Sequence, residues 1–229
     1  MLIHGLQKLT LLDDPGHTAC TVFLGQCDWR CPFCHNAELL VPDAPALMDE
    51  AELLAFLKKR QGLLESVVFS GGEPLLHRDL PALMEKVRAL GYRLKLDTNG
   101  AHPERLREIL QAGLADYVAM DIKNSPARYA ETCGAAAVDL DRISRSVSLL
   151  MHEAPDYEFR TTVVAELHDA ASFAAIGAWI RGARRYFLQP FTDRETVPFA
   201  GLHAPSRAAL EAYLDILRPF VPSAALRGI

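Results

Sequence analysis

The chain alternates short apolar runs with longer segments of helical spacing, and this alternation recurs six times. The apolar runs lie at residues 18–24, 66–69, 93–96, 117–120, 159–164 and 186–188. Segments of helical spacing lie at residues 49–60, 80–90, 103–110, 139–151, 169–180 and 206–217. Because parallel strands are joined by helical crossovers, this order predicts an α/β fold with a parallel sheet and outer helices.

The number of strand–helix units limits the architecture further. A closed barrel has eight units and typically needs about 250 residues. With six units in 229 residues, we expect an open, partial (βα)6 TIM-like barrel. No long linker or low-complexity segment interrupts the pattern, so residues 1–229 are expected to form a single domain.

Polar residues follow the predicted strands, at the end where barrel enzymes place their functional groups. They are Cys27, Ser70 to Glu73, Asp97 to Asn99, Asp121 with Lys123, Arg160 with Thr162, and Gln189. Because the carboxyl ends of parallel strands meet at one edge of a sheet, these side chains are expected to form a site around one rim.

Three cysteines, Cys27, Cys31 and Cys34, lie in the loop after the first strand, in the order C-D-W-R-C-P-F-C. Structural zinc sites and iron–sulfur cubanes commonly use four protein ligands. Three cysteines from one loop leave one metal position open for a further ligand. Spacing alone also allows a structural zinc site completed by His35 or Cys133.

Charge and cysteine usage exclude several classes of protein. The net charge of −5 argues against a strong nucleic-acid footprint. No apolar run approaches the length of a membrane span, and residues 1–10 do not read as a signal peptide. Three of the five cysteines are clustered, which does not indicate a disulfide framework. We therefore expect a cytoplasmic protein without nucleic-acid or membrane partners.

The cysteine spacing resembles that of the radical S-adenosylmethionine (SAM) superfamily, and so does Gly71-Gly72-Glu73-Pro74 at the end of the second strand. The resemblance implies that Cys27, Cys31 and Cys34 bind three irons of a [4Fe–4S] cluster while SAM chelates the fourth. Reductive cleavage of SAM then yields a 5′-deoxyadenosyl radical. It also implies that the Gly71–Glu73 segment contacts the SAM amino group and that the backbone of Phe33 contacts the adenine.

Two further segments, Asp97-Thr98-Asn99-Gly100 and Asp121-Ile122-Lys123, resemble the branch that activates glycyl radical enzymes, typified by the pyruvate formate-lyase activating enzyme. By that likeness, Lys123 and Arg160 hold anionic groups of SAM. Asp97 and Asp121 would face its amino end, its ribose or a bound monovalent cation. Considered by residue type alone, the first segment is also a good turn sequence, and Asp121 with Lys123 could be a surface ion pair.

The N-terminal stretch at residues 5–16 and the C-terminal Leu226-Arg227-Gly228 are similar to activating proteins of anaerobic (class III) ribonucleoside-triphosphate reductases. The similarity implies an activase that removes a hydrogen from a glycine Cα of the reductase large subunit, with flavodoxin or ferredoxin as electron donor. Three alternatives remain: activation of a pyruvate formate-lyase type enzyme, radical SAM chemistry on a small substrate, and a structural zinc-binding protein.

Three positions depart from the family pattern. Gln26 precedes the first cysteine where the family usually has glycine, and Asp14 stands where tyrosine is often found. After the last strand the chain has Gln189-Pro190-Phe191, where relatives that activate pyruvate formate-lyase often have histidine. The first departure raises the question whether the cysteine loop keeps its geometry.

Overall fold

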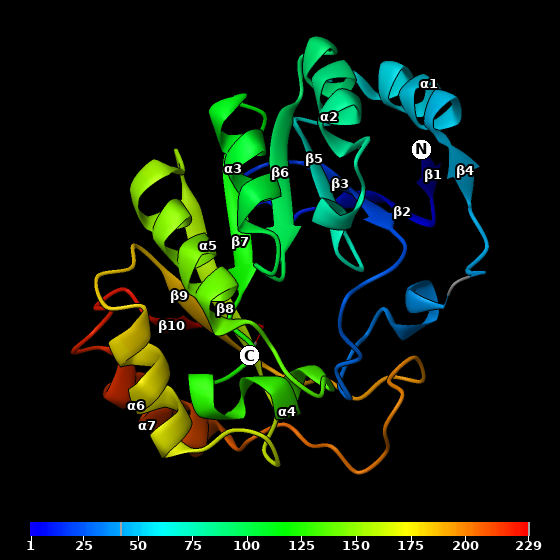
Figure 1. The fold of residues 1–229 in the computed structure, drawn as a ribbon. Helices are drawn as coiled ribbons and strands as arrows, with labels where there is room; N and C mark the ends of the chain where they lie inside the picture. Colours follow the sequence, from blue (N-terminus) through cyan, green and yellow to red (C-terminus); the bar gives the residue numbers. More distant parts are fainter. Residues whose placement is uncertain (42, 229) are drawn as a thin grey trace.

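The computed structural model describes residues 1–41 and 43–228 and contains an eight-stranded sheet (Figure 1). Its six central strands pair with one another in parallel. They are β3 (Ala19–Leu24), β5 (Ser66–Gly71), β6 (Arg93–Thr98), β7 (Tyr117–Asp121), β8 (Tyr157–Val163) and β9 (Tyr186–Pro190). The α/β partial barrel expected from the sequence is confirmed.

Four short strands were not predicted. β2 (Gly5–Thr10) pairs antiparallel with β3, and β10 (Ala225–Leu226) pairs parallel with β9. These two strands are the opposite ends of the strand order β10-β9-β8-β7-β6-β5-β3-β2, so the sheet stays open between them within the described residues. β1 (Leu2–Ile3) and β4 (Met48–Asp49) form a separate antiparallel pair.

The helices flank the outer face of the sheet (Figure 1). The six predicted ones are α1 (Glu50–Arg60), α2 (Leu80–Ala89), α3 (Pro103–Gln111), α5 (Leu140–Glu153), α6 (Ala170–Trp179) and α7 (Arg207–Leu217). Asp49 begins α1 with the capping box that its spacing to Glu52 predicts. Helix α4 (Tyr129–Cys133) and three single turns, η1 (Ala37–Leu40), η2 (Pro74–Leu76) and η3 (Pro126–Arg128), were not predicted. No helix in the described part of the chain is long and apolar enough to cross a membrane.

The two faces of the sheet differ in chemistry. Alternate residues of a strand point to opposite faces, and on β6 Leu94 and Leu96 belong to the apolar core. The residues between and after them, Lys95 and Asp97, point to the inner face of the barrel, where Lys95 is almost fully buried. The inner face of β6 therefore carries charged side chains, which need partners inside the protein.

Candidate functional site

A cavity of about 210 Å³ opens at the carboxyl ends of the parallel strands. It is lined by every site residue predicted from the sequence except Glu73: Cys27, Cys31, Phe33, Cys34, Gly71, Gly72, Asp97, Asp121, Lys123 and Arg160. Also in its lining are Trp29, His35, Asn36, Leu40, Ser70, Thr98, Asn99, Thr162 and Gln189. The fold thus gathers side chains from one loop and five strand ends into one concave site.

The cysteine loop is held in place by two of its side chains, Arg30 and Trp29. The Arg30 guanidinium donates to the carbonyl oxygens of Cys27, Trp29 and Leu40, at 2.8, 2.9 and 3.2 Å. The buried Trp29 ring meets Tyr129 edge-on, with ring centroids 5.8 Å apart. These contacts fold the loop against α4 and leave all three cysteines in the cavity lining.

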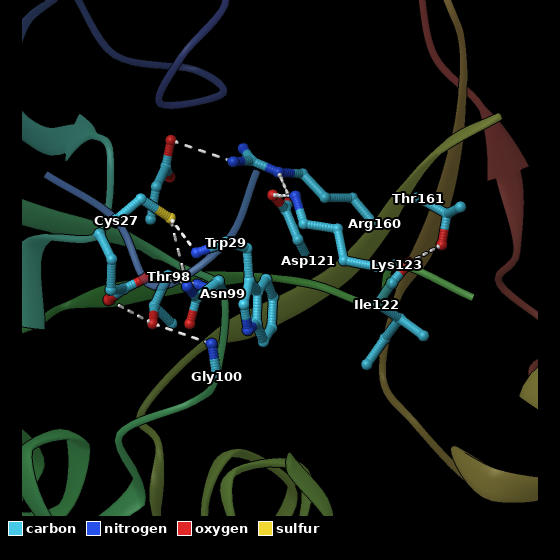
Figure 2. A network of polar contacts seen from close by, with 12 residues as sticks. Cys27, Trp29, Thr98, Asn99, Gly100, Asp121, Ile122, Lys123, Arg160 and Thr161 are labelled. Carbon is cyan, nitrogen blue, oxygen red and sulfur yellow. Dashed lines mark hydrogen bonds and ion pairs between the residues drawn. The ribbon is translucent and has the colours of Figure 1, made fainter. Parts of the chain in front are cut away.

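Cys27 is surrounded by hydrogen-bond donors (Figure 2). Its Sγ accepts from the Trp29 backbone N–H at 3.5 Å and from the Asn99 side-chain amide at 3.8 Å. Hydrogen bonds to cysteine sulfurs are one of the ways in which proteins tune iron–sulfur clusters. Three cysteines on one cavity wall, without a fourth in the lining, fit a cluster whose remaining iron is open.

The thiols differ in how readily they ionise. Burial raises the pKa of Cys27 to about 11 and also raises the pKa of Cys34. Contact with the Cys133 thiol, helped by the nearby Lys123 ammonium, lowers the pKa of Cys31 to about 7. Lys123 favours the thiolate form of all three cysteines, and thiolate is the form that binds metal.

The structure answers the question raised by Gln26. Its φ is +65°, the left-handed region that glycine adopts without steric cost. The Gln26 side chain is exposed, while its backbone N–H donates to Leu39 and its carbonyl accepts from the Glu73 N–H. The loop therefore keeps a glycine-like backbone at this position, and the glutamine carries the strain.

The two glycines of the Gly-Gly-Glu segment allow close contact between backbones. A Cβ on Gly71 would lie 2.2 Å from the Leu24 carbonyl oxygen, and a Cβ on Gly72 would lie 1.8 Å from that of Gln26. The Asn36 side chain also donates to the Gly71 carbonyl at 2.8 Å. The segment thus packs against the residue before Cys27. This contact requires glycine, independently of any contact with a ligand.

Glu73 does not line the cavity. Its fully buried carboxylate accepts from Leu75 N–H at 3.0 Å, from Thr98 Oγ1 at 2.9 Å and from Asn99 N–H at 2.6 Å. Burial raises the pKa of Glu73 to about 7, although these three donors favour the ionised form. In this structure the carboxylate holds the turn after β6, and the same turn presents Asn99 to Cys27.

Five charged side chains on β6, β7 and β8 form an alternating series that we call the charge ladder: Lys95, Asp97, Arg160, Asp121 and Lys123. Successive nitrogen–oxygen distances along it are 3.1, 3.3, 2.6 and 2.7 Å. Burial by itself raises the pKa of Asp121, but Arg160 and Lys123 hold it well below its ordinary value. Asp121 and Lys123 are thus paired inside the cavity and do not form a surface ion pair.

The charge ladder contains three cations and two carboxylates, so it carries one positive charge in excess, although Lys95 is buried outside the cavity lining. Ser70 Oγ also donates to Asp97 at 3.1 Å, and Thr162 and Gln189 complete this wall. An arginine guanidinium in such a site can bind a carboxylate with two parallel hydrogen bonds. This part of the cavity lining is therefore suited to an anionic ligand.

The residues considered for a zinc site do not converge on one point, although the Cys133 thiol contacts Cys31. Within residues 1–41 and 43–228, no group of three or more His, Cys, Asp or Glu side chains is arranged to hold a single metal ion. Cys133 is buried outside the cavity lining, and the His35 ring contacts the Thr192 carbonyl at 2.6 Å. Cysteines that bind three different irons of a cluster need not converge on one point.

Asp14 and Gln189 are the other two positions that depart from the family pattern. Asp14 is buried near the start of β5, where it accepts from Ser66 Oγ at 2.6 Å and pairs with Arg93 at 3.1 Å. Gln189 lines the cavity. Just beyond it, Phe191 stacks on His35 with ring centroids 5.7 Å apart. The periodicity of the sequence does not predict this contact between the cysteine loop and the segment after β9.

Comparisons with known proteins show which proteins the chain resembles. Residues 21–164 match the sequence profile of the Radical SAM superfamily. A Methanocaldococcus jannaschii protein, named provisionally as a glycyl-radical enzyme activating enzyme, is 28% identical over 238 residues, covering 100% of this chain and 96% of that protein. A 7-carboxy-7-deazaguanine synthase of Thermococcus kodakarensis is 39% identical over 88 residues, covering 38% of this chain and 34% of that protein.

Solved structures share the fold at low sequence identity. Streptococcus suis SuiB has a TM-score of 0.69 at 13% identity, covering 91% of this chain. The chain spans only 48% of the length of SuiB. QueE from Escherichia coli has a TM-score of 0.59 at 17% identity, covering 100% of this chain and 94% of QueE. At these identities the likeness establishes the fold alone.

Replacing Gln26 with glycine should stabilise the protein. The substitution removes a left-handed strain of about 1–2 kcal/mol and adds the entropy cost of glycine, so we expect a net gain of about 0.5–1 kcal/mol. The thermal unfolding midpoint should rise by about 1–4 °C. Gln26→Ala, which keeps the strain, is the matched control. A lower midpoint for Gln26→Gly than for Gln26→Ala would contradict the strain.

Replacing Glu73 with glutamine should change how stability depends on pH. Between pH 4.5, the ordinary carboxyl pKa, and about 7, folded Glu73 keeps a proton that the unfolded chain has lost. Raising the pH through this window therefore lowers the unfolding free energy of the wild type, and the Glu73→Gln variant lacks this contribution.

Thermal midpoints at several pH values test this expectation. Glu73→Gln also loses one acceptor and should be less stable by about 1–3 kcal/mol at low pH, with the deficit shrinking as the pH rises. Glu85→Gln, at an exposed position of α2, is the control. A deficit of Glu73→Gln that stays constant with pH would show that Glu73 is ionised throughout.

Proposed function

The chain belongs to the radical SAM superfamily, and from this premise we propose that it is a glycyl-radical-enzyme activase acting on an anaerobic ribonucleoside-triphosphate reductase. The superfamily uses a [4Fe–4S] cluster and SAM. The observation that carries the assignment to this chain is one cavity lined both by the three cysteines and by four members of the charge ladder, Asp97, Asp121, Lys123 and Arg160. The full-length similarity to the activating-enzyme relative supports the activase branch.

In this proposal Cys27, Cys31 and Cys34 hold the cluster. When bound, the cluster and SAM supply an electron and a carbon radical able to remove a hydrogen from a glycine Cα. Arg160 and Lys123 bind the SAM carboxylate, and the excess positive charge of the ladder compensates its negative charge. No side chain of the site is required to act as an acid or a base, and the protein contributes binding, orientation and exclusion of side reactions.

The remaining residues position the ligand. The Phe33 ring lies 5.9 Å from Lys123 Nζ and lines the cavity, and in this proposal the Phe33 backbone contacts the adenine. The backbone of Gly71 and Gly72 would receive the SAM amino group. A monovalent cation, if bound, would have to share the carboxylates of Asp97 or Asp121 with Arg160. Glu73 would act indirectly, by holding the turn after β6.

The shape of the barrel favours a protein substrate. The sheet is open between β2 and β10, the two unpaired edges of its strand order, and a glycine-bearing loop needs such an approach to reach a buried cavity. The electron donor would be a flavodoxin or a ferredoxin. We place the activity in the cytoplasm, where the cysteines stay reduced.

A small-substrate radical SAM reaction is the second candidate. It is favoured by the local similarity to a 7-carboxy-7-deazaguanine synthase. In this case the cavity would hold the substrate beside SAM, and no glycyl radical would form on a partner protein.

The decisive experiment is low-temperature electron paramagnetic resonance of the anaerobically reconstituted, reduced protein, first with SAM and then with the reductase. We expect a [4Fe–4S] signal that changes shape with SAM, followed by a glycyl radical doublet on the reductase. A reductase whose target glycine is replaced by alanine is the control. SAM cleavage without a doublet would reject the reductase as target and favour a small substrate or another glycyl enzyme.

Replacing Cys31 with alanine should abolish SAM cleavage, because two cysteines do not hold a cluster in the required geometry. Iron content should fall from about four per chain, the content of a [4Fe–4S] cluster, to a small fraction of that value. Cys133→Ala removes a buried thiol outside the cavity lining and should keep the iron. Full SAM cleavage by Cys31→Ala would exclude Cys31 as a ligand.

A further inference from the structure

The C-terminal Arg227 makes a contact that the proposed reaction does not use. It follows β10, and its two terminal nitrogens donate to the two carboxylate oxygens of Glu158 at 2.6 and 2.7 Å. Its guanidinium lies 3.6 Å from the centre of the Phe187 ring, and its backbone N–H donates to the Leu188 carbonyl. The two-pronged pairing and the ring contact fix the orientation of the Arg227 guanidinium.

Glu158 lies on β8, fully buried, two residues before Arg160. Residues two apart on a strand point to the same face and lie about 7 Å apart, so this carboxylate sits directly below the arginine of the charge ladder. Besides Arg227, only the Tyr117 hydroxyl donates to Glu158 among the described residues, at 2.6 Å. Burial alone raises the pKa of Glu158, but Arg227 and Tyr117 bring it below its ordinary value, so the group is ionised.

Arg160 thus has three carboxylates within its reach. Asp97 and Asp121 hold it at the cavity, at 3.3 and 2.6 Å, whereas Glu158 lies deeper in the barrel. The negative charge of Glu158 contributes to raising the pKa of Arg160. Since a buried charge without a partner is strongly unfavourable, a Glu158 that lost Arg227 would attract a cation of the charge ladder. Lys95 already acts on Glu158, and Arg160 lies on the same strand face.

We propose that Arg227 is a positioning residue: by neutralising Glu158, it leaves Arg160 with Asp97 and Asp121 at the cavity, ready for the carboxylate of SAM. The inference rests on the proposed role of Arg160 in SAM binding. It gives the terminal Leu226-Arg227-Gly228 segment a function at the site, although Arg227 itself is absent from the cavity lining.

The test compares Arg227→Met with the neutral pair Glu158→Gln/Arg227→Met. The first variant leaves a buried carboxylate unpaired, and the second removes both charges. The cluster-loaded, reduced protein is titrated with SAM, and the dissociation constant is taken from the change in the paramagnetic resonance spectrum. Iron content and thermal midpoint are measured on the same samples, and the reductase is omitted.

A matched control is Arg93→Met. It also leaves a buried carboxylate, Asp14, without its arginine, but that carboxylate is not among the groups that act on Arg160. We expect Arg93→Met to lower the thermal midpoint without weakening SAM binding.

For Arg227→Met we expect SAM binding weaker by about tenfold or more, the scale of a lost charged hydrogen bond, with unchanged iron content. The neutral pair should restore SAM affinity to within about threefold of wild type, since no unpaired charge then competes for Arg160. Undiminished affinity in Arg227→Met, or failure of the neutral pair to restore it, would overturn the proposal.

Two further outcomes also distinguish the proposal from its alternatives. If Arg227→Met does not fold, the neutral pair remains decisive by itself, because weak SAM binding there would mean that Arg227 acts other than through Glu158. Since the reductase is absent, failure to form a glycyl radical bears only on the proposed target. The predicted order of SAM affinities would survive that failure.

Discussion

The pairing of Arg160 with Asp97 and Asp121 is the interaction on which the cavity depends. These three residues come from adjacent strands β8, β6 and β7, and their charges meet where the strands end. Charges this deeply placed persist only if each has a partner, because removing one partner leaves the other buried and uncompensated. Lys95 and Lys123 extend the pairing at either end. The cationic wall is therefore fixed by the register of three parallel strands, before any ligand binds.

The opposite wall depends on backbone packing instead of charge. The cysteine loop follows β3, and its first residues lie against the end of β5, where neither Gly71 nor Gly72 has room for a side chain. The left-handed Gln26 turns the chain between these contacts, and Glu73 accepts hydrogen bonds from the next turn along the sheet. Displacement of any one of these segments would move Cys27 relative to Asn99, its hydrogen-bond donor.

The six central strands and their helices could be predicted because apolar runs and helical spacing reflect burial on the helix-facing side of the sheet. The edge strands could not: β10 has only two residues, and β2 buries little of its length. Site residues that follow strands were found from their position and the family resemblance. The roles of Lys95 and Glu158 were missed because a charged residue within a strand normally indicates a solvent-facing side, whereas here it faces a barrel interior. Glu73 was expected at the ligand, and only the structure shows its oxygens occupied by the turn after β6.

The excess positive charge of the ladder also bears on which ligand the cavity can accept. A neutral set of ion pairs would gain little from a carboxylate, because each new contact would break an existing one. With one cation in excess, a carboxylate can bind while both aspartates keep their partners. The amino end of an amino acid then has Asp97 or Asp121 beside it, so the wall matches a zwitterionic amino-acid group better than a simple anion. In the proposed function such a group is the amino-acid part of SAM, which these residues would hold, and a macromolecular substrate would enter from the open side of the sheet. The chemistry of the two walls and the gap in the strand order thus favour the same arrangement, with the cofactor fixed at the rim and the glycine brought to it.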